Sequence, residues 1–253
     1  MATRQLPSAG HDTWGDEMGS TNASVPADAP VIVGNSHAEV ILASAAREGF
    51  PLRGWAFGRG PQPPWSEDGT ELHHAVQENL QTGRVFSIVG RSHHEERGLL
   101  QHPVPFDFVL PEAPDLPLTP GAQILPYEAV RETLLKIMTF DFQIMSAVWD
   151  LAGDRMVHIL TQPPLKNLEA IEKFPAWDYG DAAISPAHLR LKLYRIYASA
   201  TRQWCAKRGV PVIDPPFEGL TDDGFLRDEY LSNATHANVD YGVFWLRRME
   251  QWL

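Results

Sequence analysis

A serine near the start of the chain lies where a nucleophile could act. The apolar run Val31–Val33 is followed by Gly34-Asn35, and Ser36 then leads into a helical pattern over residues 37–48. Open α/β sheets bind ligands at the carboxyl ends of their strands, and a helix N-terminus favours a developing negative charge. Ser36 could therefore attack a carbonyl carbon while its own N–H helps to hold the oxyanion. A serine before a helix is also a common N-cap, so the pattern leaves both roles open.

A histidine near the other end of the chain could serve as the matching base. His236 lies in the polar segment Asn233-Ala-Thr-His236-Ala-Asn238, which we expect to be a loop before a final helix. Loops held by a rigid sheet commonly carry catalytic side chains. A neutral imidazole within reach of Ser36 could take its proton and return it to the leaving group. We therefore expect Ser36 and His236 to meet across one cleft.

The strands that would position these residues are indicated by short apolar runs. Continuous apolar runs separated by helical patterns favour a parallel sheet that is covered on both faces. The runs are residues 30–33, 84–89, 156–160 and 210–213, with a weaker one near residues 52–57.

Helical patterns cover residues 37–48, 127–151 and 237–253, and a long one follows Ser185-Pro186, which predicts an N-cap and a first-turn proline. Gly209 ends that long helix. Its charged residues, Arg190 and Lys192 among them, predict a solvent-exposed face. Its cysteine, Cys205, is expected to be a small buried apolar residue.

Composition and charge exclude several classes of protein. The chain has 253 residues, 43% of them hydrophobic, which predicts a globular fold with its own core. The net charge of −11 argues against a nucleic-acid partner. No apolar run is long enough to span a membrane. Residues 1–29 predict a flexible tail without the apolar core of a signal peptide, ahead of a single domain over residues 30–253, and we expect a cytoplasmic protein.

Two further features bear on ligands. The adjacent pairs His73-His74 and His93-His94 would point in different directions on a helix or strand, so no metal site is expected, and no motif calls for a cofactor. The proline-rich segment of residues 101–126 is too long for an ordinary connection. We expect it to wall the pocket and not to form a separate domain.

Several sequence blocks, taken in order, resemble those of the SGNH (GDSL-type) hydrolases. Gly34-Asn35-Ser36-His37 is similar to the first block, and Asn233-Ala-Thr-His236 resembles the last, which is usually Asp-x-x-His. A bacterial branch of the family also shares the turn of residues 161–165, the helix opening of residues 185–193 and the segment of residues 224–242. The resemblance covers about residues 30–253. It implies a flavodoxin-like three-layer α/β/α sandwich with a mainly parallel sheet of about five strands.

The resemblance also implies roles for individual residues. Ser36 would be the nucleophile and His236 the general base, while the family's oxyanion hole combines the serine N–H, a glycine N–H and an asparagine side chain. Gly90 fits a glycine seat after the strand of residues 84–89. The asparagine seat is held by Arg91, or by Ser92 or His93. Gly58 and Gly60 remain alternatives for the glycine that follows the second strand, and Arg91 could instead bind a substrate anion.

The last block departs from the family pattern at Asn233, which occupies the position of the carboxylate that orients the histidine. An asparagine can hydrogen-bond the imidazole, but it supplies no charge to stabilise the imidazolium. Loss of that orienter can cost about 10⁴-fold in rate when the wrong tautomer results. A backbone carbonyl, Asp228 or Asp240 could take its place.

The function that these residues imply is hydrolysis of a small-molecule or carbohydrate ester through an acyl-enzyme, with Ser36 and His236 as a catalytic dyad. Two alternatives stay open. The acyl group could pass to a sugar or small-molecule hydroxyl instead of water. The fold could also be a binding protein that has lost catalysis with the substitutions at the asparagine and aspartate positions.

Overall fold

The structure is a computed structural model that describes residues 25–57, 71–90, 98–172 and 183–253. Most of the expected tail, residues 1–24, therefore lies outside the described residues. No helix in the described ranges is long and apolar enough to cross a membrane.

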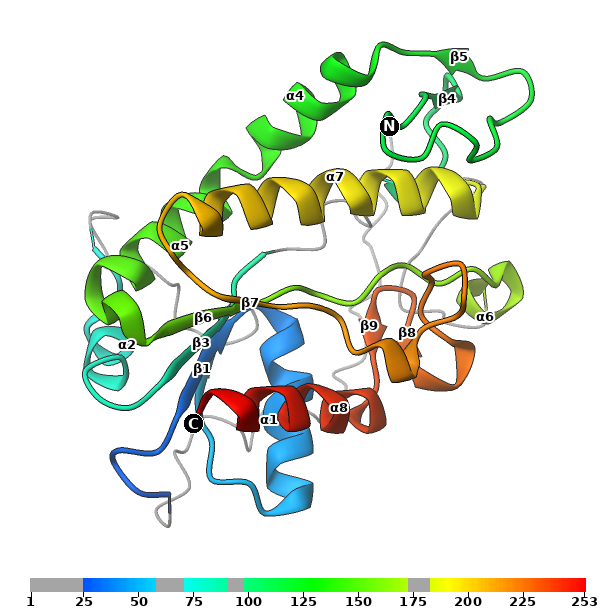
Figure 1. The fold of residues 1–253 in the computed structure, drawn as a ribbon. Coiled ribbons are helices and arrows are strands. Elements are labelled where there is room, and N and C mark those ends of the chain that lie inside the picture. The colour runs from blue at the N-terminus through cyan, green and yellow to red at the C-terminus, as the bar shows by residue number, and fades with distance from the viewer. Residues whose placement is uncertain (1–24, 58–70, 91–97, 173–182) are drawn as a thin grey trace, which may run out of the picture.

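A five-stranded sheet with the order β2-β1-β3-β6-β7 forms the centre of the molecule, and every neighbouring pair is parallel (Figure 1). Numbered along the chain, these strands follow the order 2-1-3-4-5 of flavodoxin-like sheets, whose ligands bind between the first and third strands at the carboxyl edge. The predicted parallel sheet is thereby confirmed. Its strands are β1 (Val31–Gly34), β2 (Arg53–Ala56), β3 (Val85–Ile88), β6 (Met156–Ile159) and β7 (Val212–Ile213).

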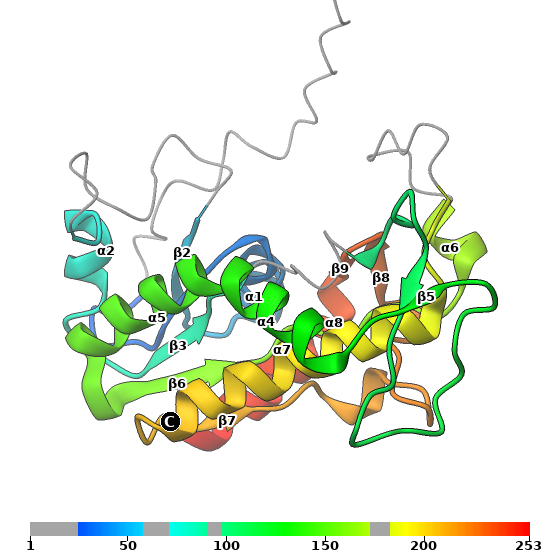
Figure 2. The same ribbon diagram turned by 90° about the horizontal axis from the view of Figure 1, so that it is seen from above.

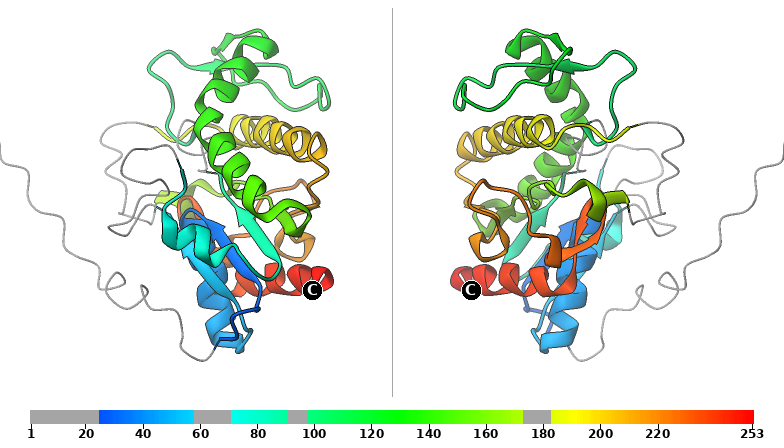
Figure 3. Two further views of the ribbon diagram at one scale, coloured as in Figure 1. Left: turned by 90° about the vertical axis from the view of Figure 1, so that its left-hand side faces the viewer. Right: turned by 90° about the vertical axis from the view of Figure 1, so that its right-hand side faces the viewer.

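Helices cover both faces of this sheet, as its continuous apolar runs require. Side chains alternate along each strand, so that Val31 and Val33 face one apolar cluster and Ile32 faces the other. Helices α1 (Ser36–Glu48) and α8 (Val239–Met249) cover one face. Helices α2 (His74–Asn79), α5 (Thr139–Ala152) and α7 (Ala187–Ala206) contribute to the cluster on the other, and α4 (Tyr127–Ile137) packs on the outer side of α7 (Figure 3).

The remaining elements are short. Helix α6 spans Leu168–Glu172, and 3-10 turns span Gly153–Arg155, Phe217–Gly219, Asp228–Tyr230 and Glu250–Trp252. Strands β4 (Phe106–Asp107) and β5 (Gln123–Ile124) pair in parallel within the proline-rich segment, while β8 (Leu231–Asn233) and β9 (His236–Ala237) form an antiparallel hairpin.

The helix predicted over residues 127–151 is two helices, because the chain bends at Met138. The ψ angle of Met138 is −6°, outside the α-helical range, and its side chain is buried. The bend lets α4 lie along α7 while α5 packs on the sheet. Neither proline nor glycine marks this position, so the periodic pattern continues across the break.

The predicted exposed face of the long helix is wrong for Arg190 and Lys192, which are both buried. The proline-rich segment covers this part of α7. Lys192 Nζ donates to Asp107 Oδ1 at 2.8 Å and to the carbonyl oxygens of Phe108 and Pro117 at 3.0 and 2.9 Å. A buried ammonium is tolerated only when its protons are paired, and here all three are.

The start of α7 also differs from the prediction, because Pro186 and not Ser185 occupies the N-cap. Ser185 instead donates its N–H to Leu99, and its carbonyl accepts from buried Arg190, whose Nη1 also donates to the carbonyl of Leu165. The predicted burial of Cys205 is confirmed, and burial raises the pKa of its thiol to about 12.

Helices α1 and α8 pack closely, which ties together the two parts of the chain that carry the candidate site. The Ser44 hydroxyl on α1 lies 2.8 Å from the carbonyl oxygen of Val239, the first residue of α8. Gly242 faces the same serine, and any side chain there would collide with its Oγ. A small residue on each helix therefore sets the distance between the two axes.

Candidate active site

The turn after β1 places Ser36 at the first position of α1. The N-cap is Asn35, with extended backbone angles, and its side chain makes no capping hydrogen bond. Ser36 is therefore not the cap, which leaves its hydroxyl free for another partner. Gly34 does not adopt a left-handed turn conformation; its Cβ would lie 2.7 Å from the carbonyl oxygen of Ile88, so glycine is required there by the close approach of β3.

The segment around His236 is the hairpin of β8 and β9, where a loop was expected. Asn233 and His236 are paired in its register, with a two-residue turn between them. Asn233 Oδ1 accepts the N–H of Thr235 at 3.0 Å, an Asx turn that shapes this connection. The hairpin lies beyond the end of the sheet where α1 begins (Figure 2).

The structure brings Ser36 and His236 together across this edge. Ser36 Oγ lies 2.6 Å from His236 Nε2, and both residues are half-buried. On the other side of the ring, His236 Nδ1 lies 2.9 Å from Asn233 Oδ1 and 3.0 Å from Thr235 Oγ1. A hydroxyl, an imidazole and an amide oxygen thus form one connected chain.

The surroundings of Asn233 determine the tautomer of the histidine. The Thr235 N–H can only donate, so the amide atom that faces it must be the oxygen, Oδ1. That oxygen has no proton to offer, and His236 Nδ1 must then carry the hydrogen that joins the two. Nε2 is left with its lone pair directed at the Ser36 hydroxyl, which is the form required of a general base.

Two buried neighbours of this chain were not among the residues predicted for the site. Gln162 follows β6 at the same edge of the sheet, and its Nε2 donates to the carbonyl oxygen of Thr235 at 2.8 Å. His37 is also buried, and its ring centroid lies 4.8 Å from that of His236. The edge rule that selected Ser36 would also have selected Gln162, since both follow buried strands of the parallel sheet.

Gly90 follows the end of β3 and contacts Asn35, the residue before Ser36, but its N–H is already engaged. It donates to Asn35 Oδ1 at 3.3 Å. Gly90 has a φ of 152°, and a Cβ at this position would lie 2.7 Å from the Tyr197 hydroxyl. Only glycine fits this backbone, which holds the ends of β1 and β3 together.

Several predicted positions lie outside the described residues, namely Gly58, Gly60, Arg91, Ser92 and His93. Of the other candidates for orienting the histidine, Asp228 Oδ2 accepts from Asn167 and Asp240 Oδ1 accepts from Arg47. The observed partners of His236 Nδ1 are Asn233 and Thr235.

A second serine–histidine contact occurs inside the sheet. His158 Nδ1 lies 3.4 Å from Ser87 Oγ, but neither residue has any exposed surface. Burial lowers the pKa of His158 to about 3, so its imidazole stays neutral at physiological pH. Because no substrate can reach this pair, it belongs to the core.

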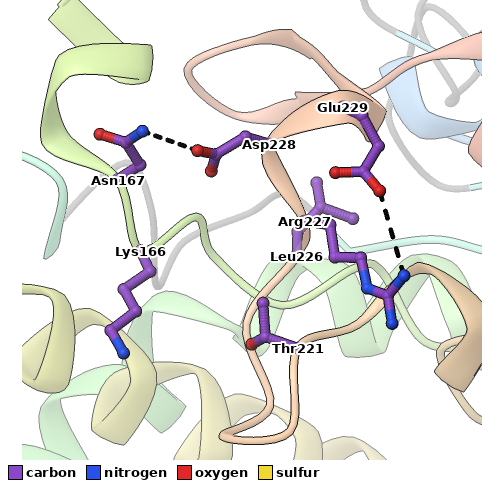
Figure 4. Close-up of a pocket in the computed structure, with 7 residues that line it drawn as sticks. All are labelled: Lys166, Asn167, Thr221, Leu226, Arg227, Asp228 and Glu229. Atoms are coloured by element: carbon purple, nitrogen blue, oxygen red, sulfur yellow. Dashed lines mark hydrogen bonds and ion pairs between the residues drawn. The ribbon is translucent and has the colours of Figure 1, made fainter.

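The described residues hold no group of three or more histidine, cysteine or acidic side chains that could bind a metal. A recess of about 510 Å³ lies next to the segment that leads into β8, and Figure 4 shows its side chains. Asn167 donates to Asp228 at 2.6 Å, and Arg227 lies 4.0 Å from Glu229. Its charged groups mostly pair with one another.

No family model matches the chain, and neither does any curated protein. Among solved structures, the chain is similar to a GDSL-like lipase from Bacteroides thetaiotaomicron, with 11% identity over 90% of both chains and a TM-score of 0.45. It is similar to phospholipase A1 from Streptomyces albidoflavus, with 10% identity over 90% of this chain and 100% of the other and a TM-score of 0.48. An extracellular lipase from Streptomyces rimosus has 11% identity over 88% and 99% of the chains and a TM-score of 0.47. These likenesses are distant, so a reaction can be assigned only from this chain's own residues.

Proposed function

We propose that the protein is a serine ester hydrolase of the SGNH (GDSL-type) kind that works through an acyl-enzyme. The observation that carries the proposal is the 2.6 Å contact between Ser36 Oγ and His236 Nε2 at the carboxyl edge of the sheet. The substrate class that we propose is a small-molecule or carbohydrate ester.

The first half of the reaction forms the acyl-enzyme. Ser36 Oγ attacks the ester carbonyl carbon as His236 Nε2 takes the hydroxyl proton, and the carbonyl oxygen becomes an oxyanion. The Ser36 N–H, in the first turn of α1, stabilises this charge together with the partial positive charge of the helix N-terminus. The C–O bond to the alcohol then breaks, and His236 returns the proton to the leaving alkoxide.

The second half regenerates the enzyme. Water gives a proton to His236 Nε2 as its oxygen attacks the acyl carbon, and collapse of the second tetrahedral intermediate releases the acid and restores the Ser36 hydroxyl. In both halves the imidazolium is oriented by Asn233 Oδ1, which accepts a hydrogen bond from Nδ1–H but adds no negative charge. The site thus keeps the orienting role of the family's aspartate without its electrostatic contribution.

Hydrolysis of a short acyl p-nitrophenyl ester tests the proposal. Ser36→Ala and His236→Ala should each lower kcat/KM by roughly 10³-fold or more, because the nucleophile and its base act as a unit. Ser232→Ala and His102→Ala are matched controls, since both residues are exposed and lie outside the Ser36–His236–Asn233 chain. Retained turnover in the Ser36→Ala variant would disprove the assignment.

Two further measurements separate the alternatives. A fluorophosphonate probe should label Ser36 in the native protein and fail to label the His236→Ala variant; absence of labelling in the native protein would favour a binding protein. Addition of sugar or small-molecule alcohols should leave the yield of free acid unchanged, whereas an esterified product would identify acyl transfer.

A further inference from the structure

The side chain of Asn35, the N-cap of α1, has an unusual hydrogen-bond partner. Asparagine at this place normally accepts a backbone N–H of the first turn, but this side chain makes no capping bond. Its Oδ1 instead accepts the N–H of Gly90, across the gap between the ends of β1 and β3. The asparagine therefore spans the point of the sheet where ligands of this fold bind.

The contact with Gly90 fixes which way the amide is turned. A backbone N–H can only donate, so the atom facing Gly90 is the oxygen, and the NH₂ group lies on the other side of the same planar amide. No described residue accepts a hydrogen bond from Asn35 Nδ2, and the residue is only half-buried. As far as the described residues go, both N–H donors of this amide are therefore open to a bound molecule.

The place of this free donor matters because Asn35 precedes the proposed nucleophile. The Ser36 N–H belongs to the peptide bond between Asn35 and Ser36. The Asn35 side chain therefore begins one residue before that N–H. At the position where the family has an oxyanion-hole glycine, the Gly90 N–H already donates to the Asn35 side chain. A second donor next to the Ser36 N–H is what a developing oxyanion needs.

We propose that the Asn35 side-chain amide is an oxyanion-hole donor, with Gly90 as the residue that orients it. The inference rests on the proposed acyl-enzyme reaction and assigns a catalytic contact to a residue of the first sequence block. An aspartate in this place could accept from Gly90 equally well but could not donate to an anion. The asparagine at this position therefore supplies a donor that a carboxylate would lack.

Two substitutions separate donation from a structural role. Asn35→Asp keeps an acceptor for Gly90 and removes the NH₂ group, whereas Asn35→Ala removes both. Loss of the donor predicts that both variants lose about 10²- to 10³-fold in kcat with little change in KM. If Asn35→Asp or Asn35→Ala keeps more than a tenth of the native kcat, the amide is not the donor.

Each substitution also has a side effect on the rate: Asn35→Asp adds a charge, and Asn35→Ala lets Gly90 shift. A spectroscopic measurement on the native protein detects the hydrogen bond from Asn35 directly. An alkylboronic acid forms a tetrahedral anion on the active serine. In ¹⁵N-labelled protein, the Asn35 NH₂ signals are assigned by their loss in Asn35→Asp. One of these protons should shift downfield when the boronate binds, and the shift should be absent in Ser36→Ala.

The outcomes distinguish this inference from the proposed function. A boronate that binds to Ser36 without moving the Asn35 NH₂ signals would overturn the role of the amide and leave the hydrolase intact. A protein that neither binds the boronate at Ser36 nor hydrolyses esters would overturn both.

Discussion

The oxygen of the Asn233 side chain lies 2.9 Å from Nδ1 of His236 and also accepts the N–H of Thr235. The hydrogen bond from Thr235 fixes the orientation of the Asn233 amide, so that its oxygen and not its NH₂ group faces the His236 ring. A neutral residue therefore selects the working tautomer. What it lacks is the charge that would favour the imidazolium of the proposed reaction.

Because Asn233 orients His236 without adding a negative charge, Asn233→Asp should show what that charge contributes. The carboxylate would keep the acceptor and add a negative charge beside the imidazolium. An opposite charge at this range is worth about 1–3 pKa units, so we expect kcat to rise at least about 10-fold. The acidic limb of the pH–rate profile should move to higher pH, because the carboxylate favours the protonated ring.

Asn233→Ala is the companion variant, since it removes the acceptor and should lower kcat. The prediction is checked by measuring kcat from pH 4 to pH 9 for all three proteins. An Asn233→Asp protein with an unchanged rate and profile would mean that Asn233 has no electrostatic influence on the base.

The packing of α1 against α8 gives a prediction about stability. A methyl group at Gly242 would collide with Ser44 Oγ, so Gly242→Ala should destabilise the protein by about 1–3 kcal/mol through overpacking. Urea unfolding measures this loss. The double variant Gly242→Ala/Ser44→Ala removes the colliding atom and should recover part of it; an equally unstable double variant would place the strain elsewhere.

Local patterns in the sequence were sufficient for much of this architecture. Each of the five apolar runs contains a strand, and in β1, β3 and β6 burial on both faces leaves a signal in consecutive residues. The position of Ser36 was predictable for the same reason, since a strand, a turn and a helix follow one another in a few residues. The meeting with His236 could be expected only from the order of the two blocks.

Features that depend on distant partners were not predictable in this way. Lys192 and Arg190 have the periodicity of an exposed helix face. Lys192 is bound by a segment some 80 positions away, whereas Arg190 donates to the carbonyl oxygen of Leu165, 25 positions away. The bend at Met138 has no proline or glycine to mark it. The place of Gln162 after a buried strand was visible in the sequence, but its partner was not, because the approach of the hairpin brings the carbonyl oxygen of Thr235 to it.

The buried ion pair of Lys192 and Asp107 should be important for stability. Lys192→Met leaves the buried Asp107 carboxylate without its ammonium partner, with the His188 imidazole at 3.2 Å and its hydrogen bonds remaining, so the variant should destabilise the protein by about 3 kcal/mol. Lys166→Met is the matched control, because Lys166 and Asp223 form an exposed pair that is worth about 0–1 kcal/mol. Comparable losses in the two variants would contradict the buried role of Lys192.

The same carboxylate predicts a pH dependence of stability. Burial alone would raise the pKa of Asp107, but hydrogen bonds from Lys192, Phe108 and Thr119 hold it below its ordinary value. A carboxylate whose pKa is lowered by folding stabilises the protein fully above its unfolded pKa of about 3.9, and this contribution is lost as the pH falls through the folded value. Urea unfolding between pH 2 and pH 7 should therefore show a steeper acid loss for the native protein than for Asp107→Asn. Parallel curves would exclude Asp107 as a source of the acid sensitivity.

Gly90 links the stability of the fold to the chemistry of the site. Its φ of 152° is unfavourable for any other residue, and a Cβ there would lie 2.7 Å from the Tyr197 hydroxyl. We expect Gly90→Ala to lower the free energy of unfolding by about 1–3 kcal/mol and to move the N–H that holds Asn35. In Gly90→Ala/Tyr197→Phe the colliding oxygen is gone, so the steric part of the loss should diminish while the backbone part remains. Ester turnover should stay low in both variants, because the backbone at residue 90 is altered in each. A Gly90→Ala protein with native stability and native kcat would show that the end of β3 adapts freely, and that the Asn35 amide does not depend on it.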